Sequence, residues 1–460
     1  MPKLDPHIFR AYDIRGKANT QITEEGCLLI GQAFGTDLRE IYQKDNPTVI
    51  VGYDARTHSP KFEQAMVDGL KKAGCKVLRM GQTPSPINYF TICTQNLDGG
   101  VQVTASHNPA EDNGIKLQVR DAEAYSGDDL QKLRERIEAE DFLEGEGGDE
   151  EFDAITPYKN HLKDLFKDAG KDLHIVIDSG NGVTGPVYCD VLRNIGCTVT
   201  ELYTEPDGTF PNHPADPSKW DTLAELQEKV KEVNADCGFG FDGDGDRVGL
   251  VDENGKIRNA DEILLLLAKD HLSGNPGASV IFTVSNSGIL QTEIEKWGGT
   301  PIMCKVGHSF VEHSMRENNA LLGGEQSGHF FCGEDYFGFD DALVATLRLI
   351  QIRTKADASF SSLFEKFPKV YQAPERRPNC PDERKTEIVS QITKYFKKDY
   401  PVKTMDGARI DFGEGAWAGI RQSNTSPKIS ICIEARSPEK LQEVEKTVLD
   451  HIAGYPEISF

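Results

Sequence analysis

The chain has 460 residues, and at roughly 150 residues per domain this length predicts about three domains rather than a single core. It contains 74 Asp and Glu residues against 51 Lys and Arg residues, which gives a formal charge of −23. Because that charge would repel a nucleic-acid backbone or an anionic membrane surface, we expect small-molecule partners, with no nucleic acid and no membrane.

The N-terminal residues and the cysteines both favour a cytoplasmic location. The chain starts without an apolar stretch as long as a signal peptide needs, and its longest strongly apolar run is the short segment 263–268. The ten cysteines are scattered without a C-x-x-C pair, which indicates neither a zinc site nor a disulfide framework. We therefore expect most of them to be buried thiols in a reducing compartment.

A β-turn-α pattern occurs three times along the chain. Apolar runs of β type end in polar or Gly-rich turns at 48–56, 173–182 and 278–288. Segments with helical periodicity follow them at 59–73, 186–195 and 289–297. The alternation predicts three related α/β units with mixed or parallel sheets covered by helices.

Composition changes indicate where these units end. Residues 138–151 combine three Gly with many carboxylates, which is typical of a solvated linker, and we place the first boundary near residue 154. After Pro368, a helix at 382–396, a strand at 428–434 and a helix at 438–452 predict a smaller α+β domain. The sequence thus predicts four domains, at 1–154, 155–256, 257–368 and 369–460.

The first candidate catalytic cluster is the segment VQVTASHNP at 101–109. A strand-like run opens there into Ser106, His107 and Asn108 before Pro109 stops regular structure, so that a hydroxyl is displayed on a turn. The Asn113-Gly114 pair then predicts a tight turn that brings Lys116 within reach of Ser106.

The second cluster is FDGDGDR at 241–247, where Asp242, Asp244 and Asp246 alternate with glycines. Hard oxygen ligands in a tightly wrapped loop favour Mg²⁺ or another divalent cation. An EF-hand is excluded because its sixth position, which requires Gly, is Arg247. The overlapping match to G-x-G-x-x-G is discounted because no helix pattern follows it, and the chain contains no P-loop motif.

Two further loops carry polar groups suited to a sugar phosphate. GGEQSGH at 323–329 offers a carboxylate, an amide, a hydroxyl and an imidazole for sugar hydroxyls, and Lys305 and His308 lie just upstream. RQSNTSP at 421–427 offers a guanidinium, hydroxyls and turn amides, which would suit a phosphate dianion.

Together with the opening FRAYDIRG at 9–16, these motifs occur in the order of the α-D-phosphohexomutase family. The chain most closely resembles the bacterial phosphomannomutase/phosphoglucomutase branch of that family. The resemblance implies a heart-shaped molecule with a central cleft, built from three related α/β domains and a smaller C-terminal α+β domain that closes over the active site.

The resemblance also implies roles for individual residues. Ser106 would carry a phosphoryl group, and Asp242, Asp244 and Asp246 would hold Mg²⁺ together with an oxygen of the phosphorylated Ser106. The positions associated with proton transfer or charge stabilisation are Arg15, Lys116, Arg247, His308 and His329. The positions expected to contact substrate are Tyr12, His107, Lys305, Glu325, Ser327, Arg421, Ser423, Asn424 and Thr425.

The activity implied is the interconversion of hexose 6-phosphate and hexose 1-phosphate through a phosphoserine enzyme and a hexose 1,6-bisphosphate intermediate. Glucose 1,6-bisphosphate would act as activator, and the protein would be a monomer or a weak dimer.

Departures from the branch pattern leave the substrate open. Gln326 stands where the branch usually has Met and is familiar from phosphoglucosamine mutases, and residues 283–286 read TVSN where a substrate-contacting Lys is common. FRAYDIRG and Ser423-Asn424-Thr425 favour mannose and glucose phosphates. The alternatives are a phosphoglucosamine mutase and, from a different class, a catalytically inactive sugar-phosphate binding protein.

Overall fold

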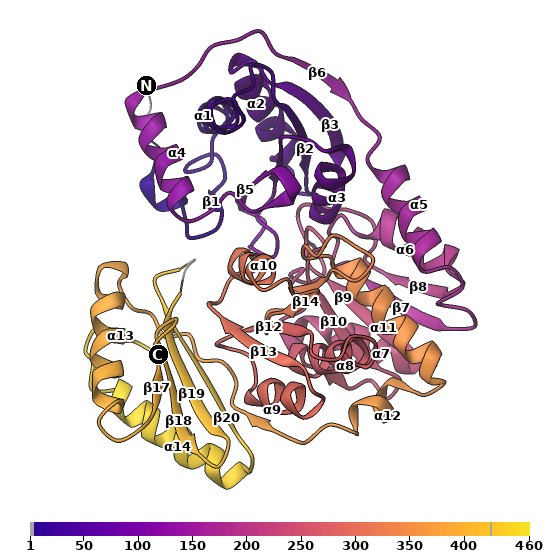
Figure 1. The fold of residues 1–460 in the computed structure, drawn as a ribbon, viewed down its shortest axis with the longest axis vertical. Coiled ribbons are helices and arrows are strands. Elements are labelled where there is room, and N and C mark those ends of the chain that lie inside the picture. The colour runs from indigo at the N-terminus through magenta and orange to yellow at the C-terminus, as the bar shows by residue number, and fades with distance from the viewer. Residues whose placement is uncertain (1–3, 424–425) are drawn as a thin grey trace. The chain divides into compact units, whose positions relative to one another are not determined.

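The computed structural model describes residues 4–423 and 426–460, whose elements are labelled in Figure 1. These residues form two compact units. Unit 1 runs from the N-terminus to Leu267 and resumes from Ser327 to Phe364. Unit 2 consists of Ala268–Gln326 and Glu365–Phe460. The helix α8 (Ala260–Gly274) contains the first point at which the chain passes from one unit to the other.

Unit 1 begins with a six-stranded mixed sheet. Its strand order is β1 (Ile14–Lys17), β5 (Asp112–Val119), β4 (Gly99–Val103), β2 (Thr48–Tyr53), β3 (Lys76–Gln82) and β6 (Gly148–Glu151). The inner strands β4, β2 and β3 are parallel, whereas β5 runs antiparallel to β4 and β1. The accompanying helices are α1 (Glu24–Tyr42), α2 (Ser59–Lys72), α3 (Ser85–Gln95) and α4 (Asp128–Ala139). Apolar side chains of the central strands, such as Val49 and Val51, are fully buried against these helices.

A second mixed sheet of unit 1 has the order β11 (Ile257–Arg258), β10 (Val248–Asp252), β9 (Cys237–Phe241), β7 (His174–Asp178) and β8 (Thr198–Leu202). Its helices are α5 (Ile155–Leu165), α6 (Gly185–Asn194) and α7 (Ala224–Glu232). The returning part of the chain adds β15 (Phe330–Cys332), α11 (Ala342–Ala356) and α12 (Phe360–Phe364). The turn between β9 and β10 is the carboxylate loop at 242–247.

Unit 2 contains a parallel sheet in which β12 (Ser279–Thr283) lies between β13 (Thr300–Cys304) and β14 (Leu322–Gly324). Two of its helices are α9 (Gly288–Lys296) and α10 (His308–Glu317). An antiparallel sheet has the order β16 (Tyr371–Gln372), β20 (Ile429–Ala435), β19 (Ala416–Gln422), β18 (Ala408–Gly413) and β17 (Val402–Lys403). The helices α13 (Asp382–Phe396) and α14 (Pro438–Ile452) pack on it.

The predicted β-turn-α alternation and the mixed sheets are confirmed. Strands begin at Thr48, His174 and Ser279, and each is followed by the expected helix, at α2, α6 and α9. The C-terminal helix, strand and helix are also present, as α13, β20 and α14. The boundaries at 154, 256 and 368 stay predictions.

Two local predictions were wrong. The segment 138–151 is not simply a linker, because α4 extends to Ala139 and Gly148–Glu151 pairs with β3 as an edge strand. Asn113-Gly114 is not a tight turn, because it lies inside β5, where Arg15 is paired with Gly114 and Gln102 with Lys116. In both places, pairing with strands distant in the sequence overrides the local preference for a turn.

All ten cysteines carry free thiols, and nine of them are buried. Burial raises the pKa of the Cys75 thiol to about 12 and that of Cys197 to about 12, so these groups are protonated at neutral pH. In the described part of the chain, no helix combines the length and the apolar character needed to cross a bilayer.

Candidate active site

The loop after β4 places Ser106 at the centre of the site. Its side chain is buried, and its hydroxyl donates to Asp242 Oδ2 over 2.6 Å. His107 Nδ1 lies 3.0 Å from the same hydroxyl oxygen. Ser106 has a φ of 50°, a left-handed conformation that costs a residue with a Cβ atom roughly 1–2 kcal/mol. The surrounding structure must therefore hold this loop in place.

The carboxylate loop wraps around Asp242. Its Oδ1 accepts hydrogen bonds from the backbone amides of Gly245, Asp246 and Arg247, over 3.0 to 3.1 Å. Gly243 is required by close approach, because a Cβ atom there would lie 2.5 Å from the carbonyl oxygen of Ser106. The structure thus brings the first two sequence clusters into direct contact.

Lys116 completes this contact from β5. Its ammonium group donates to Asp244 Oδ2 over 2.7 Å and also to Asp246 Oδ2, and the Lys116 side chain is only 3% exposed. Ser85, the first residue of α3, donates to the same Asp244 oxygen over 2.5 Å. Three buried carboxylates are therefore held by one buried ammonium group and by two hydroxyls.

The pKa values of this cluster show that its negative charge is only partly balanced. Burial, together with the charges of Asp246 and Asp244, raises the pKa of Asp242 well above its usual range. Burial opposes ionisation of Asp244 as well, but the Lys116 charge holds the pKa of Asp244 below its ordinary value. Lys116 itself loses solvation on burial, yet the two aspartates hold its pKa well above the usual value.

These residues fit a divalent cation. One oxygen from each of Asp242, Asp244 and Asp246 lies within 4.8 Å of the others, and all three residues are buried. Asp244 Oδ1 is buried and has no hydrogen-bond partner among the described residues. A small set of carboxylate oxygens with excess negative charge is the donor set that Mg²⁺ prefers.

A second trio, Asp246, His329 and Asp340, has similar spacing but suits a cation less well. Arg247 Nε donates to His329 Nε2 over 3.2 Å, so the imidazole nitrogen that would bind the metal already accepts a hydrogen bond from a cationic group. His329 Nε2 also lies 3.2 Å from Asp246 Oδ1. This arrangement joins His329 and Arg247 to the carboxylate loop.

Arg15 reaches the Ser106 loop from β1. Its Nε donates to Asp13 over 2.6 Å, and its Nη1 donates to the Asn108 side chain over 3.1 Å and to the Ala105 carbonyl over 3.3 Å. Tyr12, which precedes β1, is half-buried. Ser327, at the start of the returning segment, lies 3.3 Å from His329 Nδ1.

Unit 2 holds the remaining predicted residues. His308 is the buried first residue of α10, and the carboxylate of Glu325 accepts a hydrogen bond from the Gly307 amide over 2.8 Å. Lys305 is exposed, with its ammonium group 5.5 Å from the centre of the Phe310 ring. Arg421 and Ser423 lie where β19 ends, whereas Asn424 and Thr425 lie outside the described residues.

Sequence reasoning missed several residues that support these groups. In unit 2, Arg377 donates to the Ser423 hydroxyl over 3.1 Å, and Lys385 donates to the carbonyls of Ser423 and Ser426. In unit 1, Ser85 and Asp340 were also missed. A lone Arg, Lys or Ser carries no local pattern, so only the contact itself reveals the role of each residue.

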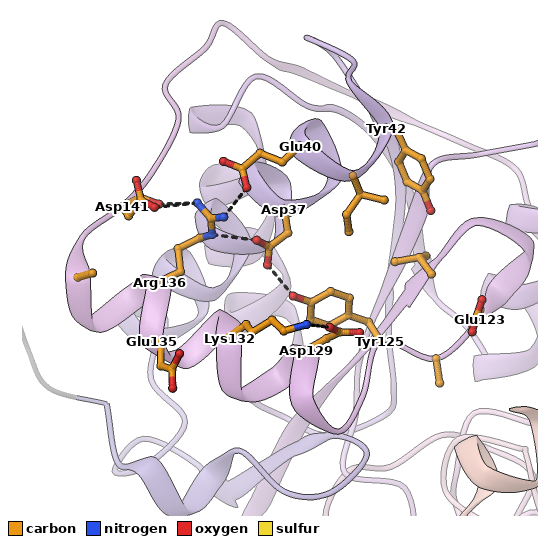
Figure 2. A pocket seen from close by; sticks show the side chains of 14 residues that line it. Asp37, Glu40, Tyr42, Glu123, Tyr125, Asp129, Lys132, Glu135, Arg136 and Asp141 are labelled. Atoms are coloured by element: carbon orange, nitrogen blue, oxygen red, sulfur yellow. Dashed lines mark hydrogen bonds and ion pairs between the residues drawn. The ribbon is translucent and has the colours of Figure 1, made fainter.

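A hollow of about 700 Å³ in unit 1 is lined by none of the site residues named above, and Figure 2 shows the side chains that line it. Its wall includes Asp37 at 9% exposure, and Arg136 extends between the carboxylates of Asp37, Glu40 and Asp141. Asp37 also accepts a hydrogen bond from the Tyr125 hydroxyl over 2.6 Å. The carboxylates of Asp37, Glu40 and Asp141 are therefore engaged within the wall, and the hollow contains no candidate catalytic residue.

The segment that follows β8 is held by an ion pair with a testable pH dependence. His213 Nε2 lies 3.1 Å from Asp178, and its Nδ1 lies 2.9 Å from the Pro214 carbonyl. Although burial lowers the pKa of His213, the bonded Asp178 carboxylate outweighs burial and raises that pKa above its usual value. The stabilisation is therefore complete below pH 6.5, the unfolded-state pKa, and is lost as pH rises through the folded-state pKa.

An interaction on the order of 1 kcal/mol that is present at pH 6 and lost at pH 8.5 lowers the midpoint of thermal unfolding by about 2 °C. We expect the wild type to show this extra fall between the two pH values, and His213→Gln to lack it. Calorimetry at the two pH values measures this difference, with His313→Gln, an exposed site, as the control. Equal pH dependence in all three proteins would contradict the prediction.

Family models match the chain in four consecutive segments. They are described as phosphoglucomutase/phosphomannomutase alpha/beta/alpha domains I, II and III, at residues 6–144, 156–255 and 259–371, and the C-terminal domain at 376–451. A phosphomannomutase/phosphoglucomutase of Pseudomonas aeruginosa is 39% identical over 97% of this chain and 95% of its own length. A phosphoglucomutase of Neisseria gonorrhoeae is 34% identical over 100% of this chain and 99% of its own.

A solved structure shows the same likeness in three dimensions. The crystal structure of a phosphoglucomutase/phosphomannomutase family protein from Burkholderia thailandensis has a TM-score of 0.92 to this chain and is 34% identical to it. The match covers 99% of this chain and all of that one. These likenesses extend over all four matched segments rather than over one shared domain.

Proposed function

The chain belongs to the phosphoglucomutase/phosphomannomutase family, and we propose that it interconverts hexose 6-phosphates and hexose 1-phosphates through a phosphorylated Ser106. The observation that carries this proposal is the contact of the Ser106 hydroxyl with Asp242 in a buried cluster of three carboxylates and Lys116. Phosphoryl transfer needs in-line positioning and local cations rather than elaborate covalent chemistry, and this cluster is suited to provide both.

Asp242, Asp244 and Asp246 would hold Mg²⁺, as is typical of the family. When bound, the cation neutralises charge on phosphoryl oxygens and polarises them. The protein contributes the rigid loop around Asp242, the counter-charge of Lys116, and the burial that strengthens each electrostatic interaction.

In the forward step, phosphorylated Ser106 donates its phosphoryl group to a hydroxyl of the bound hexose phosphate. The bond from phosphorus to the substrate oxygen forms, the bond to Ser106 Oγ breaks, and the proton of the substrate hydroxyl passes through a nearby base to Ser106 Oγ. The hexose 1,6-bisphosphate then reorients in the site, so that its other phosphoryl group faces Ser106 and is returned to it. Arg15, Lys116 and Arg247 would stabilise the charge, and His308 and His329 are the candidates for proton transfer.

Residues of unit 2 would bind the parts of the substrate that do not react. Arg421, Ser423, Asn424 and Thr425 would bind the phosphate that is not transferred, and Glu325 would accept hydrogen bonds from sugar hydroxyls. Tyr12, His107, Lys305 and Ser327 would complete the substrate contacts. The guanidinium of Arg421 is the group in this set best suited to a phosphate dianion.

The substrate is proposed to be mannose and glucose phosphates, with glucosamine phosphate as the alternative suggested by Gln326. A coupled assay with Mg²⁺ and a trace of glucose 1,6-bisphosphate, the proposed activator, would compare glucose, mannose and glucosamine 1-phosphates. We expect turnover of the first two and little of the third. Preference for the third would make the enzyme a phosphoglucosamine mutase, and no turnover of any would favour a binding protein.

Other expectations from the sequence stay predictions. They are a cytoplasmic location, a monomer or weak dimer, and the absence of nucleic-acid and membrane partners. The net charge of −23 supports the last of these, because it disfavours polyanionic surfaces.

A further inference from the structure

The loop that carries Ser106 is held by a residue that the proposed mechanism does not use. The guanidinium of Arg56, which follows β2, donates to four backbone carbonyls between Ser106 and Asp112, the first residue of β5. Its Nη2 donates to the carbonyls of Ser106 and Asn108 over 2.8 and 2.6 Å, and its Nη1 to those of Pro109 and Asp112 over 2.6 and 2.9 Å. The Arg56 residue is only 1% exposed, so no part of it is available to substrate.

Asp54 connects Arg56 to the backbone amide of Ser106 as well as to its carbonyl. Its carboxylate accepts from Arg56 Nε over 3.0 Å and from the Thr104 hydroxyl over 2.8 Å. The Thr104 hydroxyl in turn accepts from the backbone amide of Ser106 over 2.8 Å. Both the amide and the carbonyl of Ser106 are therefore tied to the Asp54–Arg56 pair, directly or through a single hydroxyl.

A segment of unit 1 distant in the sequence covers this pair. The Phe210 ring lies 5.2 Å from the Arg56 guanidinium carbon, in a cation–π contact. Gly208 packs so closely that a Cβ atom there would lie 2.3 Å from the Ala55 carbonyl oxygen. The guanidinium is thus fixed by Asp54, by the loop carbonyls and by an aromatic ring.

This arrangement accounts for the left-handed backbone of Ser106. A planar guanidinium with donors in a fixed fork imposes directions on the carbonyls that it binds, which a flexible ammonium group does not. With its amide and carbonyl both fixed, Ser106 keeps its φ of 50°, and its hydroxyl faces Asp242.

We propose that Arg56 is a positioning residue for phosphoryl transfer, which sets the backbone of the Ser106 loop so that the hydroxyl is aligned with the carboxylate cluster. This inference rests on the proposed role of Ser106 as the phosphoryl carrier. Arg56 acts through that loop and does not contact the substrate.

The test is Arg56→Lys in the full-length protein. Because misplacement of a reacting group by about 1 Å costs on the order of 10²-fold, we expect kcat to fall by about that factor while KM for the hexose phosphate stays within about twofold. The rate at which glucose 1,6-bisphosphate phosphorylates the dephosphorylated enzyme, followed by intact mass, is expected to fall by the same factor.

Arg39→Lys is the matched control. Arg39 is also largely buried and donates to two backbone carbonyls, those of Ala73 and Glu144, but it is not part of the Ser106 loop. We expect Arg39→Lys to lower the thermal midpoint without changing kcat. A kcat of Arg56→Lys within about threefold of the wild type would overturn the inference, as would an equal loss in both variants.

A second variant covers the case in which Arg56→Lys does not fold. Thr104→Val removes the link between Asp54 and the Ser106 amide at nearly constant volume, and we expect a fall in kcat of about tenfold without a change in KM. A wild-type kcat in folded Thr104→Val would overturn the inference. The proposed function fails separately, if the wild-type protein shows no mutase turnover or if Ser106→Ala retains it.

Discussion

Ser106→Ala is expected to reduce mutase turnover by about 10⁴-fold or more, because removal of a covalent nucleophile eliminates the pathway rather than weakening one contact. The substitution deletes one oxygen that contacts Asp242 and leaves the backbone hydrogen bonds of the loop in place. A coupled assay on glucose 1-phosphate measures the loss. Intact mass after incubation with glucose 1,6-bisphosphate is expected to show one added phosphoryl group in the wild type and none in the variant.

Ser314→Ala is a suitable control for this prediction, since Ser314 is a buried serine in α10 that is not a proposed catalytic residue. The Ser314→Ala variant should be phosphorylated by glucose 1,6-bisphosphate and should turn over substrate at the rate of the wild type. Retention of turnover by Ser106→Ala, or phosphorylation of that variant at comparable rate, would refute the phosphoserine mechanism.

Asp244→Asn is expected to lower turnover by about 10³-fold, because the carboxylate loop loses one formal charge and with it most of its affinity for Mg²⁺. Chelation of divalent cations from the wild type should give a loss of similar size that added Mg²⁺ reverses. Isothermal titration with Mg²⁺ measures the affinity, and Asp149→Asn, at an exposed edge strand, is the control.

The thermal midpoint in the absence of metal separates this effect from misfolding. Lys116 holds the pKa of Asp244 below its ordinary value, so removal of this charge breaks a buried ion pair and is expected to lower the metal-free midpoint. A variant that still unfolds cooperatively but has no measurable affinity for Mg²⁺ has lost the cation site rather than its fold. Unchanged affinity for Mg²⁺ in Asp244→Asn would show that the cation binds elsewhere.

The parts of the site that lie within one short segment could be predicted from the sequence. Asp242, Asp244 and Asp246 fall within five residues, and glycines between them indicate a tight loop, so their cooperation is visible without a structure. The strand pattern that ends before Ser106 and the Pro109 that follows predicted a hydroxyl displayed on a turn, and only the family resemblance singled out that hydroxyl as the phosphoryl carrier. The three β-turn-α units were predictable for the same reason, since periodicity is a local property.

The contacts that create the site could not be predicted from local pattern. Ser106 and Asp242 are separated by 136 positions, and Lys116 and Asp244 by 128. Arg56 stands at the end of a predicted strand and carries no motif of its own, yet it binds four backbone carbonyls between Ser106 and Asp112. The turn predicted at Asn113-Gly114 was wrong, because β5 pairs with a strand on each side, and this pairing overrides the local preference for a turn.

The short strand β6 gives the first sheet a shielded border. Its sequence is Gly-Asp-Glu-Glu, all four residues are exposed, and it pairs along β3. An uncovered β3 would present open backbone donors and acceptors to any passing strand, which is how sheets of different molecules join into aggregates. The charged groups along β6, where Asp149 pairs with Lys71 and Glu150 with Lys76, would have to lose water before another strand could pair there, so this edge disfavours edge-to-edge association.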